Sequence, residues 1–135
     1  MKHIEGGCLC GAVRFRAAGA PLSSVICHCR TCRRAGAAPS VAWLTFDRGS
    51  VEVIRGAPRP FASSPGVVRT FCADCGSPLT YASDARPNVI DVTTMSLDDE
   101  SLFPPTQEEW VSHKLVWQAT DPSLLQYPQD PPGSS

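Results

Sequence analysis

Apolar and polar residues alternate along much of this chain, which is the pattern of half-buried β-strands. In residues 12–16, the apolar Val13 and Phe15 alternate with Arg14 and Arg16. Because successive side chains of a strand point to opposite faces, such a run places its apolar residues on one face of a sheet. The same criteria predict further strands over residues 25–29, 40–46, 51–55, 59–62, 67–71, 79–82 and 88–94.

The gaps between these runs are rich in Pro, Gly, Ser and Asp, as in GAPRP, SSPG and SDARPN. These residues favour turns, so the sequence predicts an all-β domain of antiparallel sheets with little helix. Two short segments, residues 31–37 and 106–109, are predicted to be helical. For the second segment, the surrounding EEWVSHKLVW is equally compatible with one more strand.

Composition is that of one globular domain, with 135 residues of which 42% are hydrophobic. This is enough to bury a core without disulfides. We predict a single domain over residues 1–127, followed by a flexible tail over residues 128–135, where PQDPPGSS is rich in proline and polar residues.

The charges nearly cancel, since 12 basic residues face 13 acidic ones and the formal net charge is −1. This balance provides no general attraction to nucleic acid or to an anionic membrane, so we expect neither as a partner. The first residues lack the apolar run of a signal peptide, and no stretch has the length of a transmembrane helix. We therefore expect a cytoplasmic protein. The sequence leaves its oligomeric state open.

Seven cysteines add candidate chemistry to this picture, because an odd number cannot all pair as disulfides. In a reducing compartment, clustered cysteines more often bind metal or react than form disulfides. They fall into three clusters along the chain: Cys8 and Cys10; Cys27, Cys29 and Cys32; and Cys72 and Cys75.

The first and last clusters together supply four sulfurs. If C-x-C lies on a strand, Cys8 and Cys10 point to the same face. The C-x-x-C pair of Cys72 and Cys75 is followed by Gly76, which is typical of a turn that brings two thiolates together. Zinc binds four thiolates tetrahedrally, so we predict a structural zinc that joins the N-terminal strand to the middle of the chain. Buried free thiols or two cross-linked pairs are the alternatives.

The middle cluster supplies three sulfurs. We predict that Cys27 and Cys29 share one face of a strand and that a turn returns Cys32 to the same place. Three thiolates with an open fourth position are the pattern of a catalytic zinc, which binds water or substrate there. A closed site with a distant fourth ligand, such as His3 or His113, remains the alternative. His28 would face the other way.

The spacing of these cysteines resembles that of the glutathione-dependent formaldehyde-activating enzymes, a group that includes the centromere-protein-V-like proteins. The matching motifs are CLCG from Cys8, CHCRTCR from Cys27 and FCADCGSPL from Phe71. The MSLDDE segment from Met95 and residues 110–127 are also similar to the family, so the resemblance covers nearly the whole chain.

The resemblance implies a β-tent type of all-β fold with two zinc ions per chain. It implies that the catalytic-type zinc lies on Cys27, Cys29 and Cys32, and the structural zinc on the other four cysteines. The implied reaction joins glutathione and formaldehyde into S-hydroxymethylglutathione, and it is classed by its reverse as a carbon–sulfur lyase reaction. A small thiol and a small aldehyde are therefore the expected partners.

Three arginines flank the three-cysteine cluster, namely Arg30, Arg33 and Arg34. Arginine forks bind carboxylates well, so these residues are candidates for holding the two carboxylates of glutathione. They are also compatible with a role as solvated surface charges. The alternative function is a zinc-binding protein without catalysis, acting as a thiol carrier, a sensor or an interaction module.

Overall fold

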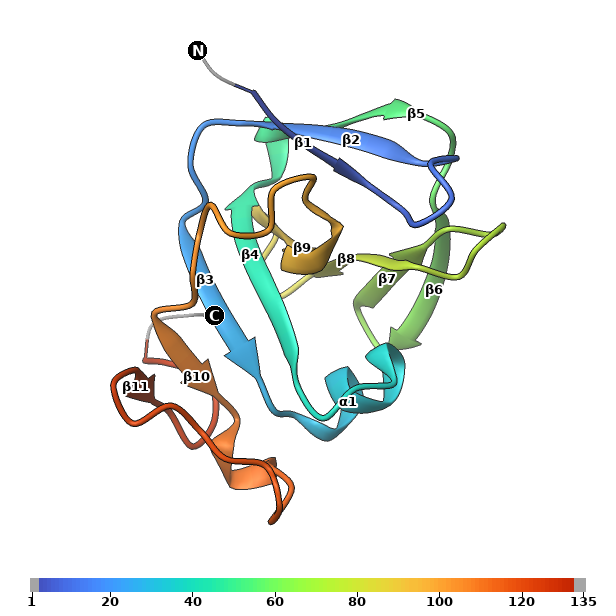
Figure 1. Ribbon diagram of the computed structural model, residues 1–135. Helices are drawn as coiled ribbons and strands as arrows, with labels where there is room; N and C mark the ends of the chain where they lie inside the picture. The colour runs from blue at the N-terminus through green and yellow to red at the C-terminus, as the bar shows by residue number, and fades with distance from the viewer. Residues whose placement is uncertain (1–2, 133–135) are drawn as a thin grey trace.

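The computed structural model describes residues 3–132, and most of its elements are strands arranged in two sheets (Figure 1). The smaller sheet has the order β1-β2-β5 and is antiparallel. Its strands are β1 (His3–Gly7), β2 (Arg14–Ala18) and β5 (Val51–Arg55). In Figure 1 this sheet lies across the top of the molecule, above the larger sheet.

The larger sheet has eight strands in the order β11-β10-β3-β4-β9-β8-β7-β6. They are β3 (Ser23–Cys27), β4 (Val41–Asp47), β6 (Arg59–Ser64), β7 (Val67–Phe71), β8 (Pro78–Ser83), β9 (Val89–Thr93), β10 (Gln107–Glu109) and β11 (Leu125–Gln126). The helical elements are α1 (Arg30–Gly36) and the short 3-10 turns η1 (Arg48–Ser50), η2 (Thr94–Ser96) and η3 (Val111–His113). This composition confirms the predicted all-β class with little helix.

The helix predicted over residues 106–109 is wrong. Residues 107–109 form a strand instead, β10, which pairs in parallel with both β3 and β11, so the larger sheet is mixed rather than purely antiparallel. The open edge of β3 offers backbone partners to this segment, and that tertiary pairing outweighs local preference. The helix predicted over residues 31–37 is present as α1.

Two cysteine segments also lie differently from the prediction. Cys8 and Cys10 occupy the loop between β1 and β2, not a strand, because β1 already ends at Gly7. Likewise, β3 ends at Cys27, and Cys29 is the residue that caps the N-terminus of α1. In both places the chain leaves the extended conformation at the first cysteine, so side-chain alternation does not align the sulfurs.

The main core lies where the two sheets face each other. Phe15 and Ala17 of β2 and Leu44 and Phe46 of β4 are buried there. Trp43, which points to the other face of β4, belongs to a second, smaller cluster together with Cys27 and Cys32. The alternation along β4 thus separates a structural core from a group of buried residues around the middle cysteines.

A buried hydrogen bond fastens β10 to the chain beyond β3. His28 Nε2 lies 2.6 Å from Glu108 Oε1, and both side chains are almost completely buried. The second carboxylate oxygen of Glu108 accepts from the backbone N–H of Asp121 at 2.5 Å. As predicted, His28 faces away from the cysteine cluster, and its contact fixes the segment that follows β10.

The C-terminal part of the described chain folds back on residues 110–112. Backbone N–H groups of Trp110 and Ser112 donate to Gln129 and Pro128, and Trp110 Nε1 donates to Asp130 at 2.8 Å. Of the tail predicted over residues 128–135, residues 133–135 lie outside the described residues. Among residues 3–132, none of the helices has the length and apolar character needed to cross a bilayer.

Candidate metal centres and the adjoining cavity

Four sulfurs meet between the two outer cysteine clusters. The Sγ atoms of Cys8, Cys10, Cys72 and Cys75 all lie within 4.8 Å of one another. The Cys8–Cys10 and Cys10–Cys72 separations are 3.7 and 3.8 Å. A tetrahedral zinc with bonds of about 2.3 Å requires sulfur separations of about 3.8 Å, whereas a disulfide requires about 2.05 Å. Donor type, number and spacing therefore fit zinc.

Two turns of similar design deliver these sulfurs. Gly11 N donates to the carbonyl of Cys8 at 3.1 Å, and Gly76 N donates to that of Cys72 at 2.8 Å. Both glycines have φ near +80°, a left-handed conformation that other residues adopt only with strain. The turns contact each other, since Leu9 N donates to Ser77 Oγ at 3.0 Å. The four ligands are thus held by backbone geometry rather than by strand alternation.

Ser77 also acts on the sulfur of Cys75. Its hydroxyl lies 3.2 Å from Cys75 Sγ. Hydrogen bonds from the side chain and the backbone of Ser77 lower the pKa of Cys75 to about 5. A thiol that ionises readily is prepared for metal binding, since the thiolate is the ligand.

The middle cluster brings three sulfurs together at the start of α1. The Sγ atoms of Cys27, Cys29 and Cys32 lie within 4.8 Å of one another. Cys29 Sγ accepts the backbone N–H of Cys32 at 3.2 Å, as an N-cap residue does. Cys27 and Cys32 are buried and Cys29 is half-buried. The end of a strand and the first helical turn therefore replace the shared strand face that the sequence predicted.

Hydrogen bonds within this cluster shift the pKa values of Cys27 and Cys32 in opposite directions. Hydrogen bonds from Cys27 and Cys29 lower the pKa of Cys32 to about 2, with a smaller contribution from Arg69. The same hydrogen bonds, together with burial, raise the pKa of Cys27. The site thus favours a thiolate at Cys32 before any metal neutralises it.

Arg69 is a site residue that the sequence did not reveal. Its Nη2 donates to Cys32 Sγ at 3.7 Å, and its guanidinium carbon lies 4.9 Å from the centre of the Tyr81 ring. Strand register produces this contact, because Arg69 stands opposite Tyr81 on the neighbouring strand. The sequence does contain one signal, a charged residue inside the apolar run VVRTF of β7. This pattern predicts that Arg69 is half-buried, but it does not predict that Cys32 and Tyr81 are its neighbours.

A cavity of about 450 Å³ adjoins Cys32. Its wall includes Cys32 and Arg69 together with three aromatic residues, Trp43, Phe61 and Phe71. Arg30 and Arg34 of α1 also contribute to its wall. The cavity therefore combines a sulfur and cationic groups with apolar side chains, as small-molecule sites commonly do.

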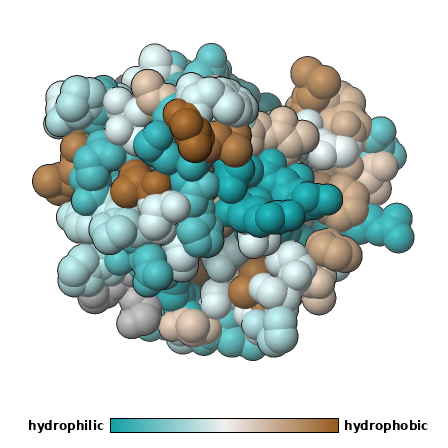
Figure 2. Space-filling view, turned by 90° about the horizontal axis from the view of Figure 1, so that it is seen from below, coloured by the Kyte–Doolittle hydropathy of each residue, from teal (hydrophilic) through white to brown (hydrophobic). Residues whose placement is uncertain are grey.

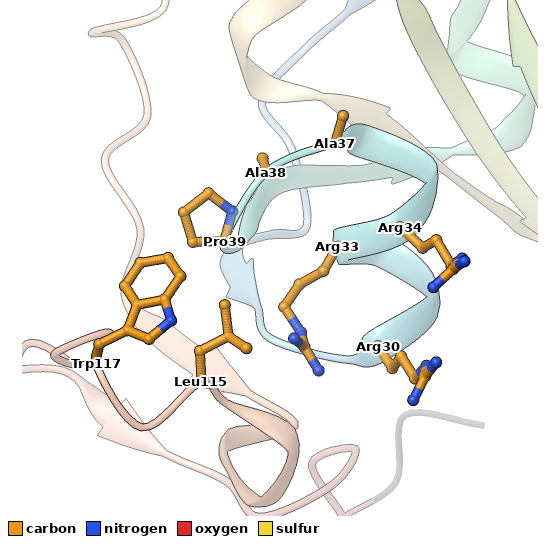
Figure 3. Close-up of a pocket in the computed structure, with 8 residues that line it drawn as sticks. All are labelled: Arg30, Arg33, Arg34, Ala37, Ala38, Pro39, Leu115 and Trp117. Carbon is orange, nitrogen blue, oxygen red and sulfur yellow. The ribbon is translucent and has the colours of Figure 1, made fainter.

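A second cavity, of about 500 Å³, lies on the other side of α1 (Figure 3). Arg33 points into it toward Leu115, and Trp117 faces Pro39 across it. The Arg33 guanidinium donates to the carbonyls of His28 and His113 at 3.1 and 3.0 Å. The Arg33 guanidinium is thus used to hold two backbone segments, at His28 and at His113, in place.

Arg30 and Arg34 differ from Arg33, because they line both cavities. Figure 2 shows the molecule from below, where strongly hydrophilic residues lie beside isolated hydrophobic ones. Of the three arginines considered from sequence, these two have access to a ligand beside Cys32. A role of Arg30, Arg33 or Arg34 in binding carboxylates stays a prediction.

No histidine within residues 3–132 belongs to either cysteine cluster. Within residues 3–132, both groups of converging metal-ligand atoms consist of cysteine sulfurs alone. His113 lies nearby, with Nδ1 accepting the backbone N–H of Arg30 at 3.4 Å and its ring 4.8 Å from that of Trp110. The closed site with His3 or His113 as fourth ligand therefore receives no support from the geometry.

Fold and sulfur clusters together define a small all-β domain with the ligand sets of a metal-binding protein. A family model described as glutathione-dependent formaldehyde-activating enzyme matches residues 3–113. This match covers most of the chain, and the protein therefore belongs to the glutathione-dependent formaldehyde-activating enzyme family. The resemblance drawn from the cysteine motifs is thereby confirmed.

Two named relatives and one solved structure are similar to this chain. An "Uncharacterized lyase" of Schizosaccharomyces pombe is 34% identical over 82 residues, which span 61% of this chain and 59% of that protein. A Halomonas elongata protein named "Putative glutathione-dependent formaldehyde-activating enzyme" is 29% identical over 111 residues, covering 76% of this chain and 70% of the relative. A crystal structure of a Rhodobacter sphaeroides protein is 25% identical with a TM-score of 0.60, covering 70% of this chain and 87% of that one.

Proposed function

We propose that this protein is a zinc-dependent carbon–sulfur lyase, which makes and breaks the bond between a thiol sulfur and an aldehyde carbon. Glutathione and formaldehyde are the proposed substrate pair. The observation that carries the proposal is the convergence of three cysteine sulfurs beside a cavity whose wall also bears Arg69. Family membership and the names of the two relatives support it.

The two sulfur sets have different proposed tasks. Cys8, Cys10, Cys72 and Cys75 would hold a structural zinc, because four protein ligands close a tetrahedral site. Cys27, Cys29 and Cys32 would hold a second zinc. Zinc bound there would lower the pKa of a thiol at its open position or, alternatively, act as a Lewis acid toward the aldehyde oxygen. This gives two zinc ions per chain.

Arginine residues of the chain would stabilise the negative charges of the substrates and of the reacting oxygen. In the forward direction the thiol loses its S–H proton, a sulfur lone pair forms the C–S bond, the C=O π pair moves to oxygen, and that oxygen takes up a proton, so no proton is gained or lost overall. The reverse direction breaks the same bond and returns the proton. Arg69, already donating toward Cys32, would stabilise the negative charge that develops on the oxygen. Arg30 and Arg34 would attract the carboxylates of glutathione.

None of the seven cysteines, all of which lie within the described residues, forms a disulfide. A protein that depends on them is best suited to a reducing compartment, so we further propose a cytoplasmic location. The same reasoning predicts loss of activity under thiol oxidants.

The proposal is tested by zinc analysis, calorimetric titration with glutathione and NMR measurement of exchange between free and thiol-bound formaldehyde. We expect two zinc ions per chain, glutathione binding and faster exchange with protein than without it. Binding without faster exchange would identify a thiol carrier instead of a lyase. A protein that is fully folded with one zinc or none would contradict the two-site assignment.

A further inference from the structure

The cavity beside Cys32 has an apolar region that the proposed reaction of a one-carbon aldehyde does not use. Phe61, on the edge strand β6, is 60% exposed and forms part of the cavity wall. It stands opposite Arg69 in the β6–β7 register. An aromatic ring at this position therefore adjoins the residue that touches the sulfur cluster.

The remaining apolar lining continues from Phe61 toward the middle of the sheet. Trp43 is buried, and with Val41 of the same strand it packs against the cluster that contains Cys27 and Cys32. Both residues line the cavity, as does Phe71 at the end of β7. Apolar side chains thus line the cavity from the exposed Phe61 to the buried Trp43, with polar residues such as Arg69 and Thr70 among them.

The apolar lining, rather than the volume of about 450 Å³, distinguishes this cavity from a site for glutathione and formaldehyde alone, because glutathione would fill part of that volume. A one-carbon unit is only slightly larger than a water and would leave most of the aromatic wall facing solvent. A larger apolar group would remove that surface from water, which is favourable.

We infer that the site takes adducts of aldehydes that carry an apolar substituent of several carbons, such as an aromatic or branched aliphatic aldehyde. The substituent would lie against Trp43 and Phe61, while the aldehyde oxygen faces Arg69. This inference rests on the proposed function, since it extends the aldehyde class of the same reaction. The bonds formed and broken are unchanged: the S–H bond breaks, the C–S bond forms, and the carbonyl oxygen gains the π electron pair and a proton.

The test uses stable thioethers that mimic the two adduct classes. S-methylglutathione represents the adduct of formaldehyde, and S-benzylglutathione represents that of an aromatic aldehyde, with its S-methylene group in place of the aldehyde carbon. Each buried methylene-sized group is worth about a fourfold gain in affinity. We therefore expect S-benzylglutathione to compete with glutathione at least about tenfold more effectively than S-methylglutathione.

Two variants test whether the higher affinity for S-benzylglutathione comes from contact with the cavity wall. Phe61→Ala should reduce the ratio between the two thioethers toward one, because it removes the ring at the cavity wall. Leu102→Ala removes an exposed apolar residue that does not line the cavity, and it should keep the wild-type ratio. A ratio that survives Phe61→Ala would overturn the assignment.

A second measurement needs no glutathione. Benzyl alcohol, titrated under NMR, should shift the indole N–H signal of Trp43 and leave that of Trp117, which lines the other cavity. Equal competition by the two thioethers would overturn the inference and leave the proposed function standing. If neither thioether nor glutathione binds, the proposed function fails, and the Trp43 shift then decides separately whether the cavity binds an apolar group.

Discussion

At the scale of single residues, Arg69 determines the charge balance of the proposed active site. Three thiolates would give the middle cluster a net negative charge, even with a divalent cation bound. The guanidinium of Arg69 lies against Cys32 and is held there by Tyr81. Its position on β7, supported on both sides by neighbouring strands, keeps a positive charge beside the sulfur without any motif in the sequence.

Replacing Arg69 by methionine should lower the rate of thiol–aldehyde exchange by about 100-fold, because a donor to developing oxygen charge is lost. Arg69→Lys should recover part of the rate, since it restores charge but not the planar fork. Steady-state kinetics should place the loss mainly in kcat, with zinc content unchanged. Arg55→Met, which alters an exposed arginine of β5, is the matched control. Equal rates for Arg69→Met and the control would remove Arg69 from the mechanism.

At the scale of elements, the two proposed metal sites differ in the type of backbone segment that carries their cysteines. The four-sulfur set joins two turns separated by more than sixty residues, whereas the three-sulfur set lies at the end of one strand and the first turn of α1. Losing the first set would disconnect the smaller sheet from the turn before β8. Losing a ligand of the second set would leave every strand pairing intact.

Cys72→Ser should therefore lower Tm by more than about 10 °C, because the metal contributes to folding directly. Cys29→Ser should change Tm by less than about 5 °C, since serine can also cap α1 at this position. Thermal unfolding with parallel zinc analysis measures both. A chelator should convert wild-type protein to the lower Tm of Cys72→Ser. If Cys29→Ser melts as early as Cys72→Ser, both sites are structural.

Sequence patterns predicted the elements where local signals suffice. Alternation located β4, β5, β7 and β9, and cysteine spacing grouped the seven sulfurs correctly into four and three. Features that depend on residues distant in the sequence could not be predicted from these local patterns. β1, with the sequence HIEGG, has no alternating pattern, and β10 is a strand only because the edge of β3 pairs with it. Glu108 meets His28 across eighty residues, a contact that no local pattern contains.

At the scale of the whole molecule, a bidentate ion pair links the smaller sheet to the chain that leaves the larger one. Arg14 of β2 donates to both carboxylate oxygens of Asp98 at 2.8 and 2.6 Å. Backbone contacts accompany it, since Asp98 N donates to Glu5 O at 3.0 Å and Gly6 pairs with Leu97. The hydrogen bonds from Arg14 lower the pKa of Asp98.

A carboxyl group whose pKa is lowered on folding stabilises the protein above its unfolded pKa of about 3.9, and this stabilisation is lost as pH falls through the lower folded value. Asp98→Asn should therefore reduce the free energy of unfolding at pH 6 by less than about 1 kcal/mol, because the pair is partly exposed. The difference from wild type should shrink as pH falls toward 3. Urea unfolding of both proteins measures it, and a difference independent of pH would show that Asp98 is not the titrating group.

The spacing of the ligands along the chain also sets an order of events during synthesis. The three middle cysteines leave the ribosome within six residues of one another, so this set is complete once Cys32 has emerged. Cys8 and Cys10 emerge first but must await Cys72 and Cys75, and closing a loop of that length carries an entropic cost. While the segment between them is synthesised, the two earliest thiols are therefore without their partners. The proposed structural centre is the last to assemble, and its earliest ligands are the ones longest exposed to oxidation and to competing metals.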